Sequence, residues 1–224
     1  MGALLDPRGS ALSWCRRERI GGDGALAAGP RASGGFCLTR AQELALIEAI
    51  RAGRPADHAL AGPLWTRRSV VGLAGSLLGV TLSSARATRL LASWGAGFRP
   101  PSSRACPLCA APVARWVETA FPAIARKAAT HRSEPHWIGR SRLYGVTPAA
   151  DVVCAVTGPS GRQRLSFVIA PGGPSATLRT DFLLGLNPTR PVHAVVDGSW
   201  ATWQLPRRLP PRVVLHAMPS CERR

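Results

Sequence analysis

The apolar positions of this chain follow two different periods, and the period changes near Pro135. Before that residue, apolar side chains recur every three or four positions, which is the period of a helix with one buried face. The pattern predicts helices over residues 41–51, 66–79, 83–94 and 113–130. Pro122 lies inside the last of these helices and is expected to kink it.

From Pro135 onward, the apolar residues gather in short runs that are typical of strands. These runs are PHWIG at 135–139, DVVCAV at 151–156, RLSFVIA at 164–170, VHAVV at 192–196 and RVVLH at 212–216. PSGR at 159–162 reads as a turn, so the second and third runs are expected to form a hairpin. A short helix over residues 175–186 is expected before the fourth run, which completes an α/β layout.

Helix start and stop signals support the first three helices. Thr66 is a candidate N-cap with Gly79 at the other end of that helix, and Ser83 or Ser84 is a candidate N-cap for the next. Three helices joined by tight turns predict a helix-turn-helix bundle whose third helix, 83–94, is the recognition helix. Trp65 and Trp94 are expected to pack in its core.

Basic residues outnumber acidic residues by 29 to 12, which gives a formal net charge of +17 at pH 7. All the basic residues except Lys127 are arginines, a bias that a GC-rich genome favours but that does not explain the shortage of acids. A pI near 11.6 favours a polyanionic partner, and double-stranded DNA is the partner that we expect. The alternative is a charged surface without a partner.

The side chains expected to contact DNA are basic or hydroxyl groups in the first segment of the chain and at the starts and exposed positions of the second and third helices. Cations in the first turn of a helix oppose the helix dipole, and contact with phosphate would offset that cost. The predicted contacts are Arg16, Arg17, Arg19, Thr66, Arg67, Arg68, Ser83, Ser84, Arg86 and Arg89.

Cysteine usage and hydropathy exclude other classes of protein. Six cysteines are scattered along the chain, and the Cys106-Pro-Leu-Cys109 pair lacks a second pair of ligands at zinc-finger spacing. We find no secretory signal and no run of 18 apolar residues, so we expect no membrane contact. A cytoplasmic, nucleoid-associated location with free thiols follows.

Several stretches, in order, resemble mariner-like bacterial insertion-sequence transposases of the DDE superfamily. They are SWCRRERIGGDGALAAGPR, LWTRRSVVGLAGSLLGVTLSSARATRLLASWG, PVARWVETAFPAIARKA, PHWIGRSR and VHAVVDGSW. The resemblance implies an α+β, multidomain chain, with an N-terminal winged helix-turn-helix bundle followed by an incomplete RNase H-like α/β domain. Its parts would be a first helix-turn-helix remnant with a basic linker (1–37), the winged unit (38–95), a linker (96–112) and a truncated catalytic domain (113–224).

The resemblance also implies a catalytic centre in which three carboxylates hold two divalent cations, Mg²⁺ in the intact family. Asp197 matches the second carboxylate, whereas Gly139 occupies the place of the first, with Arg140 beside it. The third carboxylate should follow a Pro-rich loop, and Glu222 falls too early to be that residue. A lone aspartate would hold a metal weakly, if at all, so we expect no cofactor.

The sequence therefore predicts a transposase-related DNA-binding protein, a catalytically inactive remnant that binds transposon ends. A homodimer is a further expectation, because a second copy of the chain would cover the open edge of the sheet. Two alternatives stay open. One is an active DDE transposase completed by a frameshift or by a partner subunit. The other is a stand-alone winged-helix transcriptional regulator.

Overall fold

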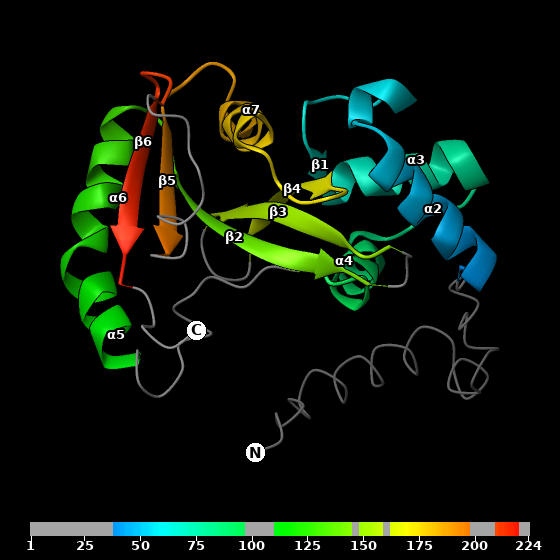
Figure 1. Ribbon diagram of the computed structural model, residues 1–224, viewed down its shortest axis with the longest axis horizontal. Coiled ribbons are helices and arrows are strands. Elements are labelled where there is room, and N and C mark those ends of the chain that lie inside the picture. Colours follow the sequence, from blue (N-terminus) through cyan, green and yellow to red (C-terminus); the bar gives the residue numbers. More distant parts are fainter. Residues whose placement is uncertain (1–37, 97–109, 145–147, 159–161, 198–208, 220–224) are drawn as a thin grey trace, which may run out of the picture. The chain divides into compact units, whose positions relative to one another are not determined.

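A mixed sheet of six strands is the centre of the structure, a computed structural model that describes residues 38–96, 110–144, 148–158, 162–197 and 209–219 (Figure 1). The strands are β1 (Trp65–Thr66), β2 (Pro135–Leu143), β3 (Ala150–Thr157), β4 (Arg164–Ala170), β5 (Val192–Asp197) and β6 (Val213–Met218). Their order in the sheet is β1-β4-β3-β2-β5-β6.

Two kinds of pairing meet at β2. Strands β2, β3 and β4 are antiparallel neighbours, whereas β5 runs parallel to β2, and β6 runs parallel to β5. The parallel connection from β4 to β5 passes through the helix α7 (Ala176–Leu186), as a parallel crossover requires. The predicted strands and the helix over 175–186 are thus confirmed, while residues 159–161 of the expected turn lie outside the described part.

The helices before the sheet are α2 (Arg40–Ala52), a 3₁₀ turn η1 (Pro55–His58), α3 (Arg67–Leu78) and α4 (Ser84–Ser93). The expected caps are confirmed: the side chain of Thr66 accepts from the backbone N–H of Ser69, and the side chain of Ser83 accepts from that of Arg86. Gly79 ends α3 with φ of 65°, a left-handed conformation that favours glycine. The described residues therefore combine helices with a mixed sheet, and the coarse prediction of an α+β fold is confirmed.

The single helix predicted over residues 113–130 is wrong. The structure has two helices instead, α5 (Ala110–Thr119) and α6 (Phe121–Thr130), which break at Ala120. Pro122 occupies the first turn of α6, where its missing N–H costs nothing. A proline at this position would have interrupted the hydrogen bonds of a continuous helix, so it starts a new helix rather than kinking one.

Strand β2 is longer than the sequence pattern predicted. Its expected end at Gly139 was wrong, because residues from Gly139 to Leu143 continue to pair with β3. Arg140, Ser141 and Arg142 are polar, so this half of the strand has no apolar period to mark it. Gly139 therefore lies in the middle of β2, directly opposite Cys154 of β3.

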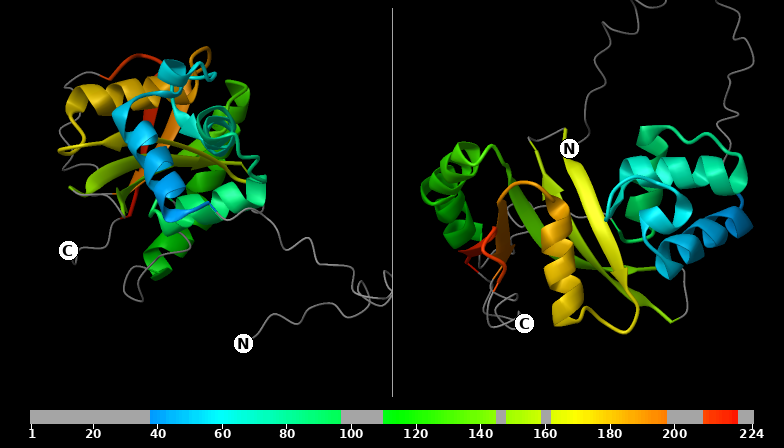
Figure 2. Two further views of the ribbon diagram at one scale, coloured as in Figure 1. Left: turned by 90° about the vertical axis from the view of Figure 1, so that its right-hand side faces the viewer. Right: turned by 90° about the horizontal axis from the view of Figure 1, so that it is seen from above.

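Helices cover both faces of the sheet (Figures 1 and 2). On one face, Phe182 and Leu183 of α7 pack in a buried cluster with residues of β2, β3, β5 and β6. On the other face, Val113 of α5 packs with Val195 and Met218. Strand β5 is buried on both sides, which explains why it reads as a nearly continuous apolar run.

The helices α2 to α4 are joined to the sheet at two places. Strand β1, which directly precedes α3, pairs with β4, setting Trp65 opposite Phe167. After α4, the carbonyl of Trp94 accepts from the backbone N–H of Tyr144 at 2.8 Å. A Cβ added to Gly95 would meet the carbonyl oxygen of Arg142, so only glycine fits this close approach.

Residues 40–224 form one compact unit, in which the segment predicted as a winged domain shares contacts with the sheet. Trp65 and Trp94 are buried, as predicted. The segment 1–37 and most of the predicted linker 96–112 lie outside the described residues. None of the described helices has the length and apolarity needed to span a bilayer.

Candidate nucleic-acid interface

An open cleft of about 1670 Å³ lies between the α3–α4 pair and the neighbouring ends of β3 and β4. The loop before β2 and the segment between α7 and β5 complete its walls. Its lining contains arginines from four separate segments of the chain, namely Arg67, Arg68, Arg132, Arg164 and Arg190. Among the described residues of this lining, Glu134 is the single carboxylate. The cleft therefore concentrates positive charge that side chains within it do not balance.

The α3 wall of the cleft begins at the N-cap Thr66. Arg67 and Arg68 follow in the first helical turn, and both are exposed. The guanidinium of Arg67 donates to the hydroxyl of Thr88 on α4 at 3.3 Å, which fixes it across the mouth of the helix pair. Two cations at this helix end are unfavourable for the helix dipole, so a bound anion would stabilise the arrangement.

The α4 wall is formed by residues that recur at helical spacing: Ser84, Thr88, Leu91 and Ala92. These side chains are short or buried, so a ligand can approach the helix closely. Their hydroxyl groups offer hydrogen bonds without charge.

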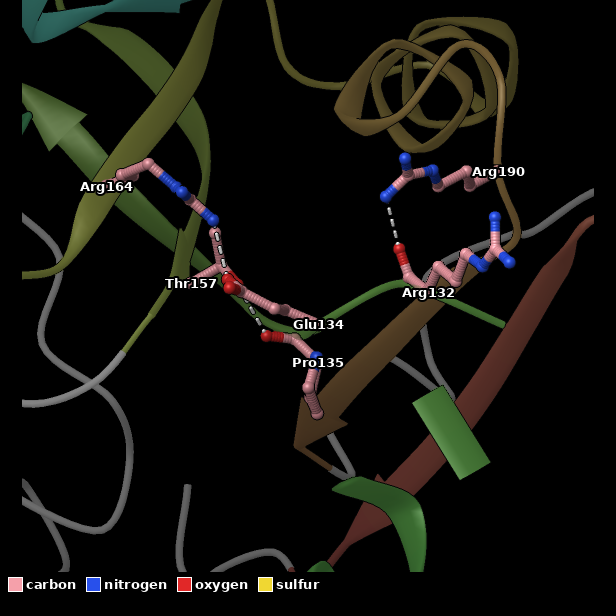
Figure 3. A network of polar contacts seen from close by, with 6 residues as sticks. All are labelled: Arg132, Glu134, Pro135, Thr157, Arg164 and Arg190. Carbon is pink, nitrogen blue, oxygen red and sulfur yellow. Dashed lines mark hydrogen bonds and ion pairs between the residues drawn. The ribbon is translucent and has the colours of Figure 1, made fainter. Parts of the chain in front are cut away.

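The floor of the cleft holds a small polar network between the loop before β2 and the end of β3 (Figure 3). A guanidinium nitrogen of Arg164 lies 2.6 Å from the Oε2 atom of Glu134. The hydroxyl of Thr157 lies 3.1 Å from the same oxygen and 2.9 Å from the carbonyl oxygen of Pro135. One carboxylate oxygen is thus held by a cation and a hydroxyl together.

A second pair of arginines lies at the other side of this network (Figure 3). The guanidinium of Arg190 donates to the backbone carbonyl of Arg132 at 2.6 Å. Arg132 follows the end of α6 in the left-handed region, with φ of 51°, where glycine is the usual residue. The chain thus places an arginine at a position whose backbone conformation disfavours any side chain.

His136 also lines the cleft but adds no charge to it at neutral pH. The side chain is buried, and this burial lowers its pKa from 6.5 to about 4. Glu134 opposes the shift, whereas Arg164 and His193 add to it. The positive charge of the cleft therefore comes from its arginines.

Three other histidines form a hydrogen-bonded row on the face of the sheet that α6 covers. His193 lies 2.9 Å from His131 and 3.1 Å from His216, measured between ring nitrogens. His193 is fully buried, which confirms the prediction of a buried or edge histidine on this strand. Burial, followed by the neighbouring histidines and Lys127, lowers the pKa of His193.

The metal site that the resemblance implies falls on two strands that pair with each other, β2 and β5. The β2–β5 pairing runs from Pro135 opposite His193 to Trp137 opposite Val195, and Gly139 and Asp197 each lie two residues beyond its last pair. Arg140 forms an ion pair with Asp151 of β3 at 3.0 Å. Gly139, at the position implied for the first carboxylate, offers no ligand, and Arg140 follows it in the strand.

Mg²⁺ does not fit this arrangement. The ion needs carboxylate oxygens, but Gly139 has no side chain, and Asp151 on the neighbouring strand is already paired with Arg140. Within the described residues, no group of three or more His, Cys, Asp or Glu side chains is arranged to hold a metal ion. Cys154 is buried, and its thiol donates to the carbonyl of Gly139, while the other cysteines lie outside the described part.

The structure gathers some of the predicted DNA contacts and separates others. Thr66, Arg67, Arg68 and Ser84 line the cleft. The remaining residues of the predicted recognition helix, Ser83, Arg86 and Arg89, are not part of its lining. Residues 16, 17 and 19 lie outside the described residues.

Sequence reasoning missed Arg132, Arg164 and Arg190, together with Glu134 and Thr157. These residues are far apart along the chain and belong to segments predicted as strands or loops, so no local period connects them. The only signal in the sequence is the excess of arginine itself.

Comparisons of this chain with protein-family models, with curated proteins and with solved structures found no match.

Proposed function

We propose that this protein binds double-stranded DNA through the arginine-lined cleft, and that it is a transposase-related protein without strand-transfer activity. The observation that carries the proposal is the lining of the cleft, where five arginines from four segments accompany one carboxylate. Such an excess of charge in a concave surface attracts a polyanion and raises its local concentration.

The kind of cation favours phosphate as the recognised group. Guanidinium groups present paired N–H donors that match phosphate oxygens, and they keep their charge at every physiological pH. Uncharged donors and acceptors, including Ser84, Thr88, Gln163 and Asn187, lie among the arginines. Hydroxyl and amide groups of this kind commonly contact the sugar-phosphate backbone.

The composition of the described lining, which has no large aromatic side chain, favours a duplex over a single strand. Proteins that bind single strands stack the bases on aromatic side chains. None of the described residues in the lining is a phenylalanine, tyrosine or tryptophan. We therefore expect contacts with the backbone of a duplex, which carries a phosphate charge for about every 1.7 Å of its axis.

The order of the strands supports the relation to RNase H-like transposases. Three antiparallel strands, a crossover helix and two parallel strands beside the first strand are the layout expected of such a domain. In this layout β2 pairs with β5, and these are the strands on which the resemblance implies the first two catalytic acids, at Gly139 and Asp197. The loss of the first acid, with Arg140 as its neighbour, is the reason that we propose an inactive protein.

The proposal is tested by fluorescence anisotropy of a labelled duplex of random sequence with the full chain, over a range of salt concentrations. We expect log Kd to rise linearly with log salt, with a slope near 0.9 for each phosphate contacted. The same-length single strand should bind more weakly. Binding that is independent of salt, or absent, would contradict the proposal.

The two alternatives predict different results in related assays. An active transposase completed by a partner would cleave or join DNA with Mg²⁺ or Mn²⁺ once that partner is added. A stand-alone regulator would show saturable preference for one DNA sequence over the random duplex. We expect neither activity, because backbone contacts carry little sequence information.

A further inference from the structure

The network on the floor of the cleft resembles an anion site that the protein itself fills. Arg164 and Thr157 both bind the Oε2 atom of Glu134, at 2.6 Å and 3.1 Å. A guanidinium and a hydroxyl that converge on one anionic oxygen are the donors that also bind a phosphate oxygen. The carboxylate of Glu134 stands where such an oxygen would be held.

Glu134 is able to leave this position without unfolding the protein. It lies between α6 and β2, in a segment that is neither helix nor strand, and its side chain is 50% exposed. The side chain of Arg164 is 67% exposed. An ion pair this open to water stabilises the protein by at most about 1 kcal/mol, so a rotation of the Glu134 side chain breaks it at low cost.

Thr157 keeps a partner whichever way Glu134 turns. Its hydroxyl has one proton and two acceptors in reach, because the carbonyl oxygen of Pro135 is 2.9 Å away. Thr157 is buried and would be costly to leave without a hydrogen bond, but the Pro135 carbonyl removes that cost. The release of Glu134 therefore orphans no buried group.

We propose that Arg164 and Thr157 form a subsite for a backbone phosphate of DNA, and that Glu134 occupies this subsite in the free protein as an internal competitor. The inference rests on the proposed binding of DNA through the cleft and adds a means of limiting it. A phosphate that displaces Glu134 gains Arg164 as a fifth cationic contact in the cleft. Glu134 thus keeps nonspecific affinity below the level that the arginines alone would give.

The experiment compares Glu134→Gln with Glu118→Gln in the full chain. Both variants gain one unit of net charge, but Glu118 is an exposed residue of α5 and does not line the cleft. With the labelled random duplex, we expect Glu134→Gln to tighten binding by about 10-fold at low salt, and to steepen the salt slope by about 0.9. Glu118→Gln should change binding by less than about 2-fold, because screened charges far from the ligand contribute little.

A double-variant cycle assigns the gain to Arg164. Arg164→Gln should weaken binding more in the Glu134→Gln background than in the natural chain, where Glu134 already competes for that arginine. Equal binding by Glu134→Gln and Glu118→Gln, while the natural chain binds the duplex, would overturn this inference and leave the proposed function intact. Failure of both the natural chain and Glu134→Gln to bind would overturn both.

Discussion

The arginine-lined cleft and the middle of β2 differ in how their charges are balanced. In the cleft, five arginines face a single carboxylate, Glu134. At the middle of β2, Arg140 is matched by Asp151 at 3.0 Å, beside a glycine where the resemblance places a metal ligand. One region has several arginines around one acid in a cleft open to a polyanion, and in the other the acid that is shown is already paired with an arginine.

This difference separates the place of a site in the sheet from the side chains that would perform its chemistry. Strand β2, which contains Gly139, pairs with β5, which ends at Asp197, so the two strands that the resemblance requires to be neighbours are neighbours. Backbone pairing depends on strand order and register, which tolerate many side chains, whereas metal binding depends on particular carboxylates. In the relation to transposases that we propose, the pairing of these strands is therefore kept while the residues of the catalytic centre have changed.

The largest expected effect comes from removing positive charge inside the cleft, and removal of the same charge outside the cleft is the control. Arg67→Ala with Arg68→Ala should weaken duplex binding by about 30-fold, since each lost charged contact costs about 1 kcal/mol. Arg86→Ala with Arg89→Ala removes the same charge from α4, outside the lining, and should cost under about 3-fold. Anisotropy measures both.

This matched pair also decides between the cleft and the recognition helix predicted from sequence. A greater loss in the Arg86 and Arg89 variant would move the interface to that face of α4. Stability serves as the control: the Arg67 and Arg68 variant should unfold no earlier in urea, because cations in a first helical turn oppose the dipole.

A second prediction tests whether the charge of the cleft is independent of histidine. The folded-state pKa of His136, about 4, lies below its unfolded value of 6.5, so the unfolded chain takes up the proton first as the pH falls. The stability contributed by neutral His136 is therefore full above pH 6.5 and is lost as the pH falls toward 4. Between about pH 7 and pH 5 the free energy of unfolding should fall by about 2 kcal/mol from this residue.

Urea unfolding at several pH values measures this effect, with His136→Asn as the comparison. The variant should lose the part of the slope that His136 contributes, and a slope of the same sign should remain from His193 and His216, whose pKa values burial also lowers. An unchanged slope would show that His136 has the same pKa in the folded and unfolded states, so that the cleft gains a further charge below about pH 6.5.

A third prediction concerns the arginine held in a left-handed conformation. Arg132→Gly should stabilise the protein by about 1 kcal/mol, because glycine adopts this backbone conformation without strain. The same change should weaken duplex binding several-fold by removing a cation from the cleft. Arg126→Gly, in the middle of α6, should instead destabilise the protein by about 1 kcal/mol.

Thermal unfolding measures the expected gain in stability, and anisotropy measures the expected loss of duplex binding. If Arg132→Gly destabilised the protein, the side chain would contribute more to the fold than its strained backbone costs. The opposite changes in stability and binding are the signature of a residue kept for its ligand.

The smallest expected effect is that of divalent metal. Millimolar Mg²⁺ or Mn²⁺ should leave the melting temperature of the free protein unchanged, because a ligand stabilises only a folded state that binds it. A rise in melting temperature that disappears in Asp197→Ala would show a working metal site. That result would show that the middle of β2 also belongs to a ligand site, as the cleft does, and would favour the alternative of an active transposase.

Local sequence signals were sufficient for most of the secondary structure. Thr66, Gly79 and Ser83 mark helix ends through hydrogen bonds and backbone conformations confined to a few neighbouring residues. The signals failed where distant pairing decided the outcome, as in the polar half of β2, which is a strand because β3 lies beside it.

The cleft was only partly predictable, for a related reason. Arg67 and Arg68 could be selected because a helix start is visible in the sequence. Arg164 and Arg190 could not, because their positions in the cleft depend on the packing of β4 and of the chain after α7 against the helix pair.

By itself, the sequence determined the net charge, the helix ends and the apolar runs, since these depend on composition and on interactions within a few residues. The tertiary structure decided which arginines share one surface, where Glu134 lies among them and which acid pairs with Arg140. Those outcomes depend on strand order and register, which bring together residues that no short stretch of the chain connects.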